Sequence, residues 1–350
     1  MSTTDAVVDA MTPEPLETQC EWRTDTLRDS YVFHLTGTHL TELDAALAHA
    51  EAASDDVLDI TRENFPLPTL GAELQRVTRD LIDGRGVALV RGLPSDQYGK
   101  ERASQIYWGV GMHLGAPWPQ NAKGHLLGDV TDQGKKPGDP TSRGNEIGGV
   151  PFPFHSDGSD LVGLFCLDPG KRGGASLVAN AVTMHNDLVR DSPDLAAELY
   201  EPMPYDLRGE QQPGTKGWYT MPVFTRCDDR LFVRYIRPYI EASRRHADAP
   251  RPSAGATEAM NRLDEMCRDP QYRVSMMLQP GDMQFVNNYH VLHARHAYVD
   301  RRDEGKVRHL KRLWLETDLL TDQEKPERFR LGRTDGYWSS KGRTKSELQI

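Results

Sequence analysis

The sequence predicts a mainly β protein with flanking helices, an α+β fold whose core is a β-sandwich or jelly roll. Two observations support this fold class. Short strand patterns separated by turns follow one another through the second half of the chain. Helical patterns lie mainly before these strands or are inserted between them, which is typical of a β core with helical flanks.

Two helices are expected near the N-terminus. Apolar residues recur at helical spacing over 41–53, and Thr41 and Asp44 form a possible capping box there. A second apolar stripe predicts a helix over 70–81, which Gly84 ends.

A short buried strand is expected over 87–90, followed by a helix over 100–114. The next stretch, 115–149, is too rich in Gly, Pro and Lys to predict a core element. We interpret it as a long loop that is either a lid or pocket wall beside a functional site, or a plain surface excursion.

Beyond residue 150 strands dominate, and two helical segments interrupt them. The expected elements are strands over 161–167 and 175–180, two helical pieces that end near Tyr200, a hairpin from 220–226 and 230–236, a helix near 256–268, and strands over 272–278, 283–288 and 308–316.

The composition is that of a folded protein with one domain over 21–320. Residues 1–20 are polar and contain proline, so a disordered tail is expected there, and 321–350 form a second polar tail. The net charge of −10 argues against nucleic acid as a partner, and no apolar run is long enough for a membrane span. Four widely spaced cysteines and the absence of a signal-peptide pattern predict a cytoplasmic location.

The sequence PFPFHSDGSD, residues 151–160, contains the first candidate site. His155 and Asp157 are two residues apart, so in an extended chain their side chains share one face. An imidazole and a carboxylate could then bind one metal ion, although an ordinary polar pair at a strand entrance has the same pattern.

An open iron site uses two histidines and one carboxylate, so a third ligand is needed. The stretch 280–300 offers His290, His293 and His296. In a strand, His290 and His293 face opposite sides, so only one of them is expected to be a ligand.

The strand expected over 308–316 carries two arginines on one face. Arg308 and Arg312 alternate there with Leu310 and Trp314. Two guanidinium groups on one side of an apolar strand indicate an anion, such as a dicarboxylate cosubstrate, unless both simply face water.

In these motifs the chain resembles the TauD/TfdA family of iron- and 2-oxoglutarate-dependent oxygenases, which are similar to taurine dioxygenase and clavaminate synthase. The resemblance extends over about 84–316 and depends on four motifs in the family's order: HSD, GGAS, NNYHVLHARHAY and RHLKRLW. It implies a double-stranded β-helix, the cupin-like variant of the jelly roll.

The resemblance also implies a metal site and a cosubstrate site. His155, Asp157 and His293 match the family's Fe(II) ligands, which leaves His290 and His296 as neighbours. Arg308 matches the arginine that pairs with the distal carboxylate of 2-oxoglutarate. Two further cosubstrate positions follow: Ser176 stands where relatives usually carry Thr, and Arg312 matches an arginine that supports the cosubstrate or faces the substrate.

The activity implied is the oxidation, most simply the hydroxylation, of an unactivated C–H bond with O2, releasing succinate and CO2. Halogenating relatives lack the carboxylate ligand, which Asp157 supplies here. The alternatives are a zinc-dependent hydrolase on a jelly roll, which would have no use for Arg308, and a non-catalytic sensor that binds a metal or ligand.

A small, polar or anionic metabolite is the expected substrate, because no separate recognition domain is visible. Arg312 would suit a carboxylate, sulfonate or phosphate group, and Gln120 and Asn121 are candidate contacts from the long loop. His125, Arg208 and Glu210 are further polar candidates, although for each of these five residues the stabilisation of a loop or turn is the more usual role. A homo-oligomer is possible.

Overall fold

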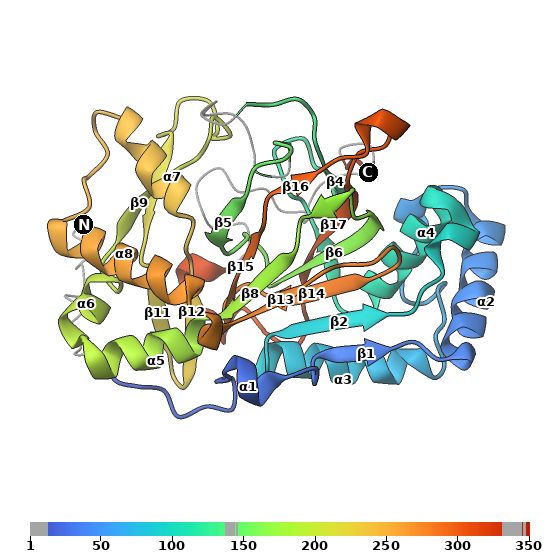
Figure 1. Ribbon diagram of the computed structural model, residues 1–350, viewed down its shortest axis with the longest axis horizontal. Coiled ribbons are helices and arrows are strands. Elements are labelled where there is room, and N and C mark those ends of the chain that lie inside the picture. Colours follow the sequence, from blue (N-terminus) through green and yellow to red (C-terminus); the bar gives the residue numbers. More distant parts are fainter. Residues whose placement is uncertain (1–12, 137–143, 145, 331–344, 346–347) are drawn as a thin grey trace, which may run out of the picture.

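The computed structural model describes residues 13–136, 144, 146–330, 345 and 348–350, and these form a mixed α/β fold (Figure 1). The described part contains eight α-helices and seventeen strands. A large sheet and a smaller one lie at its centre and pack through an apolar cluster to which both contribute side chains.

The large sheet has seven strands in the order β1-β2-β14-β6-β17-β3, and β4 also pairs with β17. All neighbours are antiparallel except β1 and β2. The strands are β1 (Val32–His34), β2 (Val87–Arg91), β3 (Ala116–Trp118), β4 (Leu127–Thr131), β6 (Leu161–Asp168), β14 (Met283–Asn287) and β17 (His309–Glu316).

The small sheet has four antiparallel strands in the order β13-β8-β15-β5. They are β5 (Phe152–His155), β8 (Ser176–Asn180), β13 (Arg273–Met276) and β15 (Val291–Arg295). Three two-stranded pairs complete the strands: β7 (Arg172–Gly173) with β16 (Tyr298–Val299), β9 (Met203–Asp206) with β10 (Trp218–Met221), and β11 (Phe224–Cys227) with β12 (Arg230–Val233).

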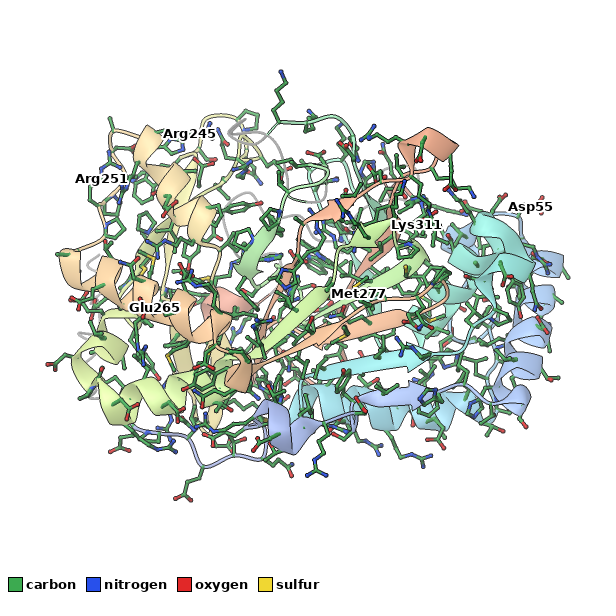
Figure 2. The ribbon with its side chains drawn as sticks, viewed as in Figure 1. Asp55, Arg245, Arg251, Glu265, Met277 and Lys311 are labelled. Carbon is green, nitrogen blue, oxygen red and sulfur yellow. The ribbon has the colours of Figure 1, made fainter. Side chains whose placement is uncertain are left out.

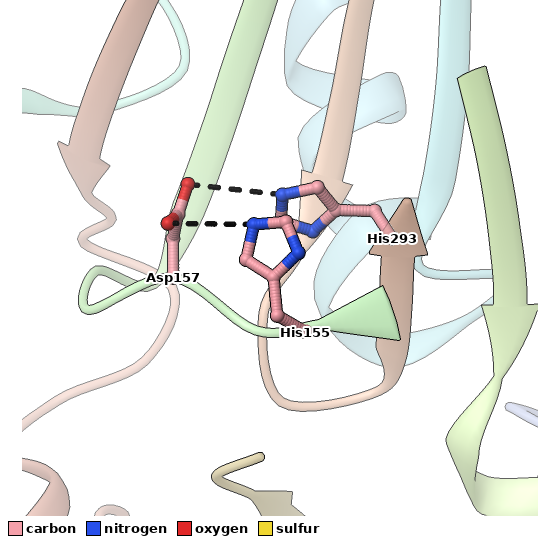
Figure 3. A group of neighbouring side chains, drawn as sticks. All are labelled: His155, Asp157 and His293. Carbon is pink, nitrogen blue, oxygen red and sulfur yellow. Dashed lines mark ion pairs between the residues drawn. The ribbon is translucent and has the colours of Figure 1, made fainter. Parts of the chain in front are cut away.

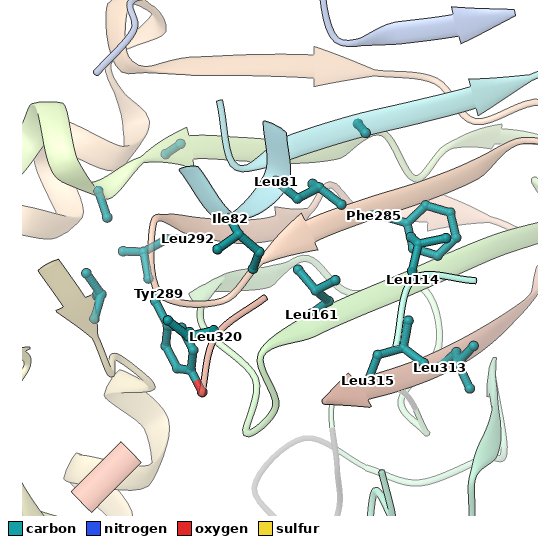
Figure 4. Close-up of a cluster of buried hydrophobic side chains, with 14 of the residues drawn as sticks. Leu81, Ile82, Leu114, Leu161, Phe285, Tyr289, Leu292, Leu313, Leu315 and Leu320 are labelled. Atoms are coloured by element: carbon teal, nitrogen blue, oxygen red, sulfur yellow. The ribbon is translucent and has the colours of Figure 1, made fainter. Parts of the chain in front are cut away.

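The large sheet is buried on both faces, which explains its continuous apolar sequences. In β2, Val87 and Leu89 belong to the cluster between the sheets, whereas Ala88 and Val90 belong to the cluster beneath the helices. Figure 4 shows part of this second cluster, where Leu81 lies near strand residues of the sheet.

Helices cover the outer face of the large sheet and one end of the small one (Figure 1). They are α1 (Thr24–Leu27), α2 (Gly37–Ala53), α3 (Leu70–Asp83), α4 (Ser95–Met112), α5 (Ala181–Asp191), α6 (Pro193–Glu198), α7 (Arg237–Ala242) and α8 (Ala254–Arg268). Charged side chains of the periphery, such as Asp55, Arg251 and Glu265, point away from this body (Figure 2).

The predicted helices are present, but the start of the first was wrong. Helix α2 begins at Gly37, where Thr36 accepts a hydrogen bond from the backbone N–H of His39. Thr41 instead donates to the carbonyl of Gly37 within the helix. Thr36 is the cap because its backbone is extended just before the helix.

The sequence predicted a long loop over 115–149, but the structure has two strands in this stretch. They are β3 and β4, and both pair with β17. These strands are short and are stabilised by pairing with a strand far away in the sequence, so they cannot be predicted from local composition. Residues 137–143 and 145 lie outside the described residues.

The described part of the N-terminal tail is packed against the body and is not disordered, while the C-terminal tail, where it is described, closes over the body, one of the two arrangements that the sequence left open. Leu16 and Cys20 are buried, and the backbone of Leu16 exchanges hydrogen bonds with the side chain of Asn186. At the other end, Lys325 and Phe329 are buried against the body. Residues 1–12 of the expected N-terminal tail lie outside the described residues.

Lys325 forms a buried ion pair with Asp160, at 2.8 Å between Nζ and Oδ2. Asp160 also accepts hydrogen bonds from the Tyr289 hydroxyl and the Thr317 backbone N–H. The C-terminal segment is therefore attached to the start of β6 and to the turn before β15. No helix among the described residues has the length and apolar character needed to cross a bilayer.

We expect Lys325→Met to lower the free energy of unfolding by about 3–5 kcal/mol, because it leaves the Asp160 carboxylate buried without its counter-charge. Denaturant unfolding monitored by circular dichroism measures this loss. The control is Lys345→Met, which removes an exposed lysine that pairs with Asp56 and Asp59 and should therefore change the free energy of unfolding much less. Equal small losses in both variants would contradict the role of the buried pair.

Candidate metal centre and active site

Two histidines of the small sheet lie directly opposite each other. His155 ends β5, and the strand register pairs it with His293 in the middle of β15. Directly opposed side chains of an antiparallel pair share a face, so the rings lie together, with centroids 4.1 Å apart. Figure 3 shows both rings turned toward the carboxylate of Asp157.

Asp157 follows β5 in a turn, where its backbone N–H donates to the side-chain oxygen of Asn288. Its Oδ1 lies 3.9 Å from His155 Nε2, and its Oδ2 lies 3.7 Å from His293 Nε2. One ligand atom from each of the three residues lies within 4.8 Å of the others, the only such group among the described residues. The predicted triad is therefore brought together.

The backbone sets the orientation of the first imidazole. His155 Nδ1 lies 2.9 Å from the carbonyl oxygen of Pro153, which places the proton on Nδ1. His155 Nε2 is then free to act as a ligand. A hydrogen-bonded second nitrogen is the usual arrangement of a metal-binding histidine.

Burial and charge favour two neutral imidazoles and one carboxylate. Burial lowers the pKa of His155, and burial together with the neighbouring His155 lowers the pKa of His293 to about 3. Burial alone would raise the pKa of Asp157, but Arg312 and the two histidines outweigh it and bring that pKa to about 2. At neutral pH all three groups are in the protonation state that binds metal.

The three residues predicted to bind the cosubstrate lie beside the triad. Ser176, Arg308 and Arg312 line one cavity with all three candidate ligands. Arg308 is only 3% exposed, and its Nη1 has no hydrogen-bond partner among the described residues. Burial and the nearby charge of Arg295 lower the pKa of Arg308 to about 10.

The candidate substrate residues divide into two groups. Gln120, Arg208 and Glu210 line a second cavity that also borders His155, Asp157 and Arg312. Gln120 accepts a hydrogen bond from Arg312 Nε at 2.7 Å, so it also orients that guanidinium.

The structure does not bring Asn121 to either cavity. Its side-chain oxygen accepts from the backbone N–H groups of Lys123 and His125, and its amide nitrogen lies 2.9 Å from His125 Nδ1. Asn121 therefore stabilises a turn, and His125 is part of the same turn.

The other two histidines of the 280–300 stretch do not join the triad. His290 precedes β15 and lines a separate cavity with Cys20 and Arg230, while His296 follows the strand and is exposed. This arrangement is consistent with the prediction that the stretch contains a strand and supplies a single ligand.

Sequence reasoning assigned no role to two residues that support the site, Trp314 and Arg234. Trp314 donates from Nε1 to Asp157 Oδ2 at 3.1 Å, and Arg234 Nη1 donates to the Asp157 carbonyl at 2.8 Å. The alternation along β17 could have identified Trp314, because it shares a face with Arg312. Arg234 had no local signal, since it lies in a different part of the chain just after β12.

Two neutral imidazoles and a carboxylate beside a cavity form the donor set of an open, non-haem iron site. The protein belongs to the class of mononuclear iron oxygenases that this site defines. The model of the family described as "Taurine catabolism dioxygenase TauD, TfdA family" matches residues 47–314, and the chain belongs to this family. The predicted class, an iron- and 2-oxoglutarate-dependent dioxygenase, is confirmed over the hydrolase and sensor alternatives.

Individual relatives support the family and the fold. The chain is 32% identical over 266 residues to FR-33289 synthase of Streptomyces rubellomurinus (strain ATCC 31215), covering 75% of this chain and 78% of that protein. A structure of asparagine oxygenase matches with a TM-score of 0.65 at 18% identity, covering 88% of this chain and 98% of that one. The non-haem iron oxygenase OrfP, in complex with Fe and alpha-ketoglutaric acid, matches with a TM-score of 0.63 at 18% identity, over 84% and 96% of the chains.

We expect Trp314→Phe to weaken divalent metal binding by about tenfold or more, because the carboxylate of Asp157 loses the donor that orients it. Titration of metal-free protein with Co(II), followed by absorbance, measures the affinity. The control is Trp118→Phe, since Trp118 lies opposite Trp314 in the strand register and its Nε1 has no partner among the described residues. Equal metal affinities for the two variants would show that the hydrogen bond from Trp314 to Asp157 does not contribute to metal binding.

Proposed function

We propose that His155, Asp157 and His293 hold Fe(II) and that Arg308 binds the distal carboxylate of 2-oxoglutarate. The observation that carries this proposal is the unpartnered Nη1 of the buried Arg308, which lines the same cavity as the triad. A buried guanidinium nitrogen without a hydrogen-bond acceptor is costly, and a carboxylate is the group that best satisfies it. A zinc hydrolase would leave this cation without a use.

Ser176 is proposed to contact the same carboxylate. Its hydroxyl lies 2.6 Å from Gln284 Oε1, across the space between the two sheets. The two ends of the Gln284 amide can exchange places by a rotation of 180°. With the amide nitrogen toward Ser176, Gln284 would donate and the Ser176 hydroxyl would donate to the cosubstrate.

The substrate is proposed to be a small polar or anionic metabolite that enters from the second cavity. This cavity is lined by Arg312, Arg208, Glu210 and aromatic side chains, so it offers both signs of charge beside the triad. The asparagine oxygenase structure holds Fe(II), a hydroxyasparagine and succinate, which supports hydroxylation of a small polar molecule. Asn121 is no longer proposed as a contact.

When bound, Fe(II) with 2-oxoglutarate and O2 supplies an oxidant for an unactivated C–H bond and leaves succinate and CO2. The chain's own residues prepare this chemistry. Arg312 lies 3.7 Å from Asp157 Oδ2 and keeps this carboxylate ionised. Apolar side chains such as Phe152, Leu164 and Leu310 line the cavity and exclude water from it.

The two central sheets are proposed to be those of a double-stranded β-helix. Their antiparallel pairing and the apolar cluster between them support this assignment. The single domain over 21–320, the cytoplasmic location and a possible homo-oligomer stay predictions, as does the lack of nucleic-acid and membrane partners.

Addition of Fe(II) and then 2-oxoglutarate to metal-free protein without O2 should give the visible charge-transfer band of a chelated cosubstrate. His293→Ala and Asp157→Ala should abolish this band, because each removes one of the proposed ligands. The control is His296→Ala, which removes an exposed imidazole of the same stretch and should keep the band. A full band in His293→Ala, or a band lost equally in His296→Ala, would contradict the ligand assignment.

Arg308→Gln should raise the dissociation constant for 2-oxoglutarate roughly tenfold to a hundredfold, because a hydrogen-bonded charge pair is lost. Anaerobic titration of the band measures the constant. Arg302→Gln is the matched control, since the side chain of Arg302 is 64% exposed and faces Asp132 and Asp300 instead of the cavity. An unchanged dissociation constant in Arg308→Gln would show that another cation binds the distal carboxylate.

A further inference from the structure

We propose that Arg295 is a second binding residue for the distal carboxylate of 2-oxoglutarate, and that it connects this carboxylate to the segment 147–150 before β5. The inference rests on the proposed function, because it concerns the same cosubstrate.

The strand register places Arg295 at the cosubstrate end of the cavity. Within β15, Arg295 is two residues after His293, so both side chains point toward the same face of the small sheet. On the neighbouring strand β8, Ser176 lies directly opposite Arg295. The cavity lining includes all three residues together with Arg308.

Arg295 and Arg308 are two cations whose guanidinium groups have no carboxylate partner among the described residues, since the nearby Asp300 accepts from the backbone N–H of Arg308 and not from its guanidinium. The guanidinium carbons of Arg295 and Arg308 lie 4.8 Å and 5.1 Å from the centroid of the same ring, that of Tyr298. Arg295 Nε and Arg308 Nη1 are both buried without a hydrogen-bond partner, and neither residue forms an ion pair within the described part of the chain. Arg308 is buried and Arg295 is partly buried, so their like charges are poorly screened, and one carboxylate near both would relieve the repulsion and satisfy both donors.

The other end of the Arg295 guanidinium binds the segment that leads into β5. Nη2 donates to the carbonyl of Val150 at 2.9 Å and lies 3.4 Å from the carbonyl of Ile147. The backbone N–H of Tyr298 donates to the carbonyl of Gly149 in the same segment. Because the loop contacts use Nη2 and leave Nε unpaired, Arg295 can hold the segment and the carboxylate at the same time.

The test compares two cosubstrates that differ only at the distal end. 2-Oxoglutarate carries the distal carboxylate, and 2-oxopentanoate has a methyl group in its place. Both are titrated without O2 into the Fe(II)-loaded wild type, Arg295→Gln, Arg308→Gln and the exposed control Arg302→Gln. The dissociation constants come from the charge-transfer band, so no turnover is required.

We expect Arg295→Gln to raise the dissociation constant for 2-oxoglutarate roughly tenfold, because a hydrogen bond to a charged group is lost. The dissociation constant for 2-oxopentanoate should change less than about twofold. Arg295→Lys keeps the charge and should lose less. A second readout is limited proteolysis of metal-loaded protein, in which 2-oxoglutarate should protect the segment 147–150 of the wild type more than that of Arg295→Gln.

The outcomes separate this inference from the proposed function. If the wild type does not prefer 2-oxoglutarate over 2-oxopentanoate, the assignment of Arg308 fails. If the wild type has this preference and Arg308→Gln loses it, but Arg295→Gln keeps it in full, only the role of Arg295 is overturned. If Arg295→Gln weakens both cosubstrates equally, Arg295 merely supports the loop, and the inference is wrong; if this variant does not fold, Arg295→Lys is judged by the same criteria.

Discussion

The site depends on one cross-strand pairing, that of His155 with His293. Because β5 and β15 are antiparallel and in this register, the two imidazoles must share the inner face of the small sheet. A shift of one residue would turn one ring outward and remove the site. The large sheet behind them contributes Arg312 and Trp314 from β17, so the carboxylate of Asp157 lies between groups from both sheets.

Charge is distributed unevenly along the space between the sheets. Near the triad, Asp157 balances Arg312 and stays ionised despite its burial. At the opposite end, Arg295 and Arg308 form no side-chain ion pair within the described residues, and Asp300 accepts from the backbone N–H of Arg308 and not from its guanidinium, so that end favours an anion. The cavity therefore has a preferred direction for a ligand that carries a chelating group at one end and a carboxylate at the other.

Much of the site could be predicted from the sequence because its residues lie in strands with a simple alternation. His155 with Asp157, and Arg308 with Arg312, were each predicted by a period of two, and the family resemblance then selected His293. The rest depends on pairing between distant segments. β3 and β4 are short and rich in breakers, and only β17 makes them strands. Gln120 and Asn121 are adjacent, yet one binds Arg312 and the other closes a turn, which composition cannot distinguish.

The ion pair between Lys325 and Asp160 has a consequence for how the protein is made. The first two candidate ligands, His155 and Asp157, are synthesised well before His293 and Lys325. The nascent chain thus carries an incomplete chelate until β15 joins β5, and the loop after Asp157 acquires its counter-charge only when the last segment folds back. A ribosome-bound intermediate that stops before β15 would therefore lack one of the three candidate ligands and have no complete site.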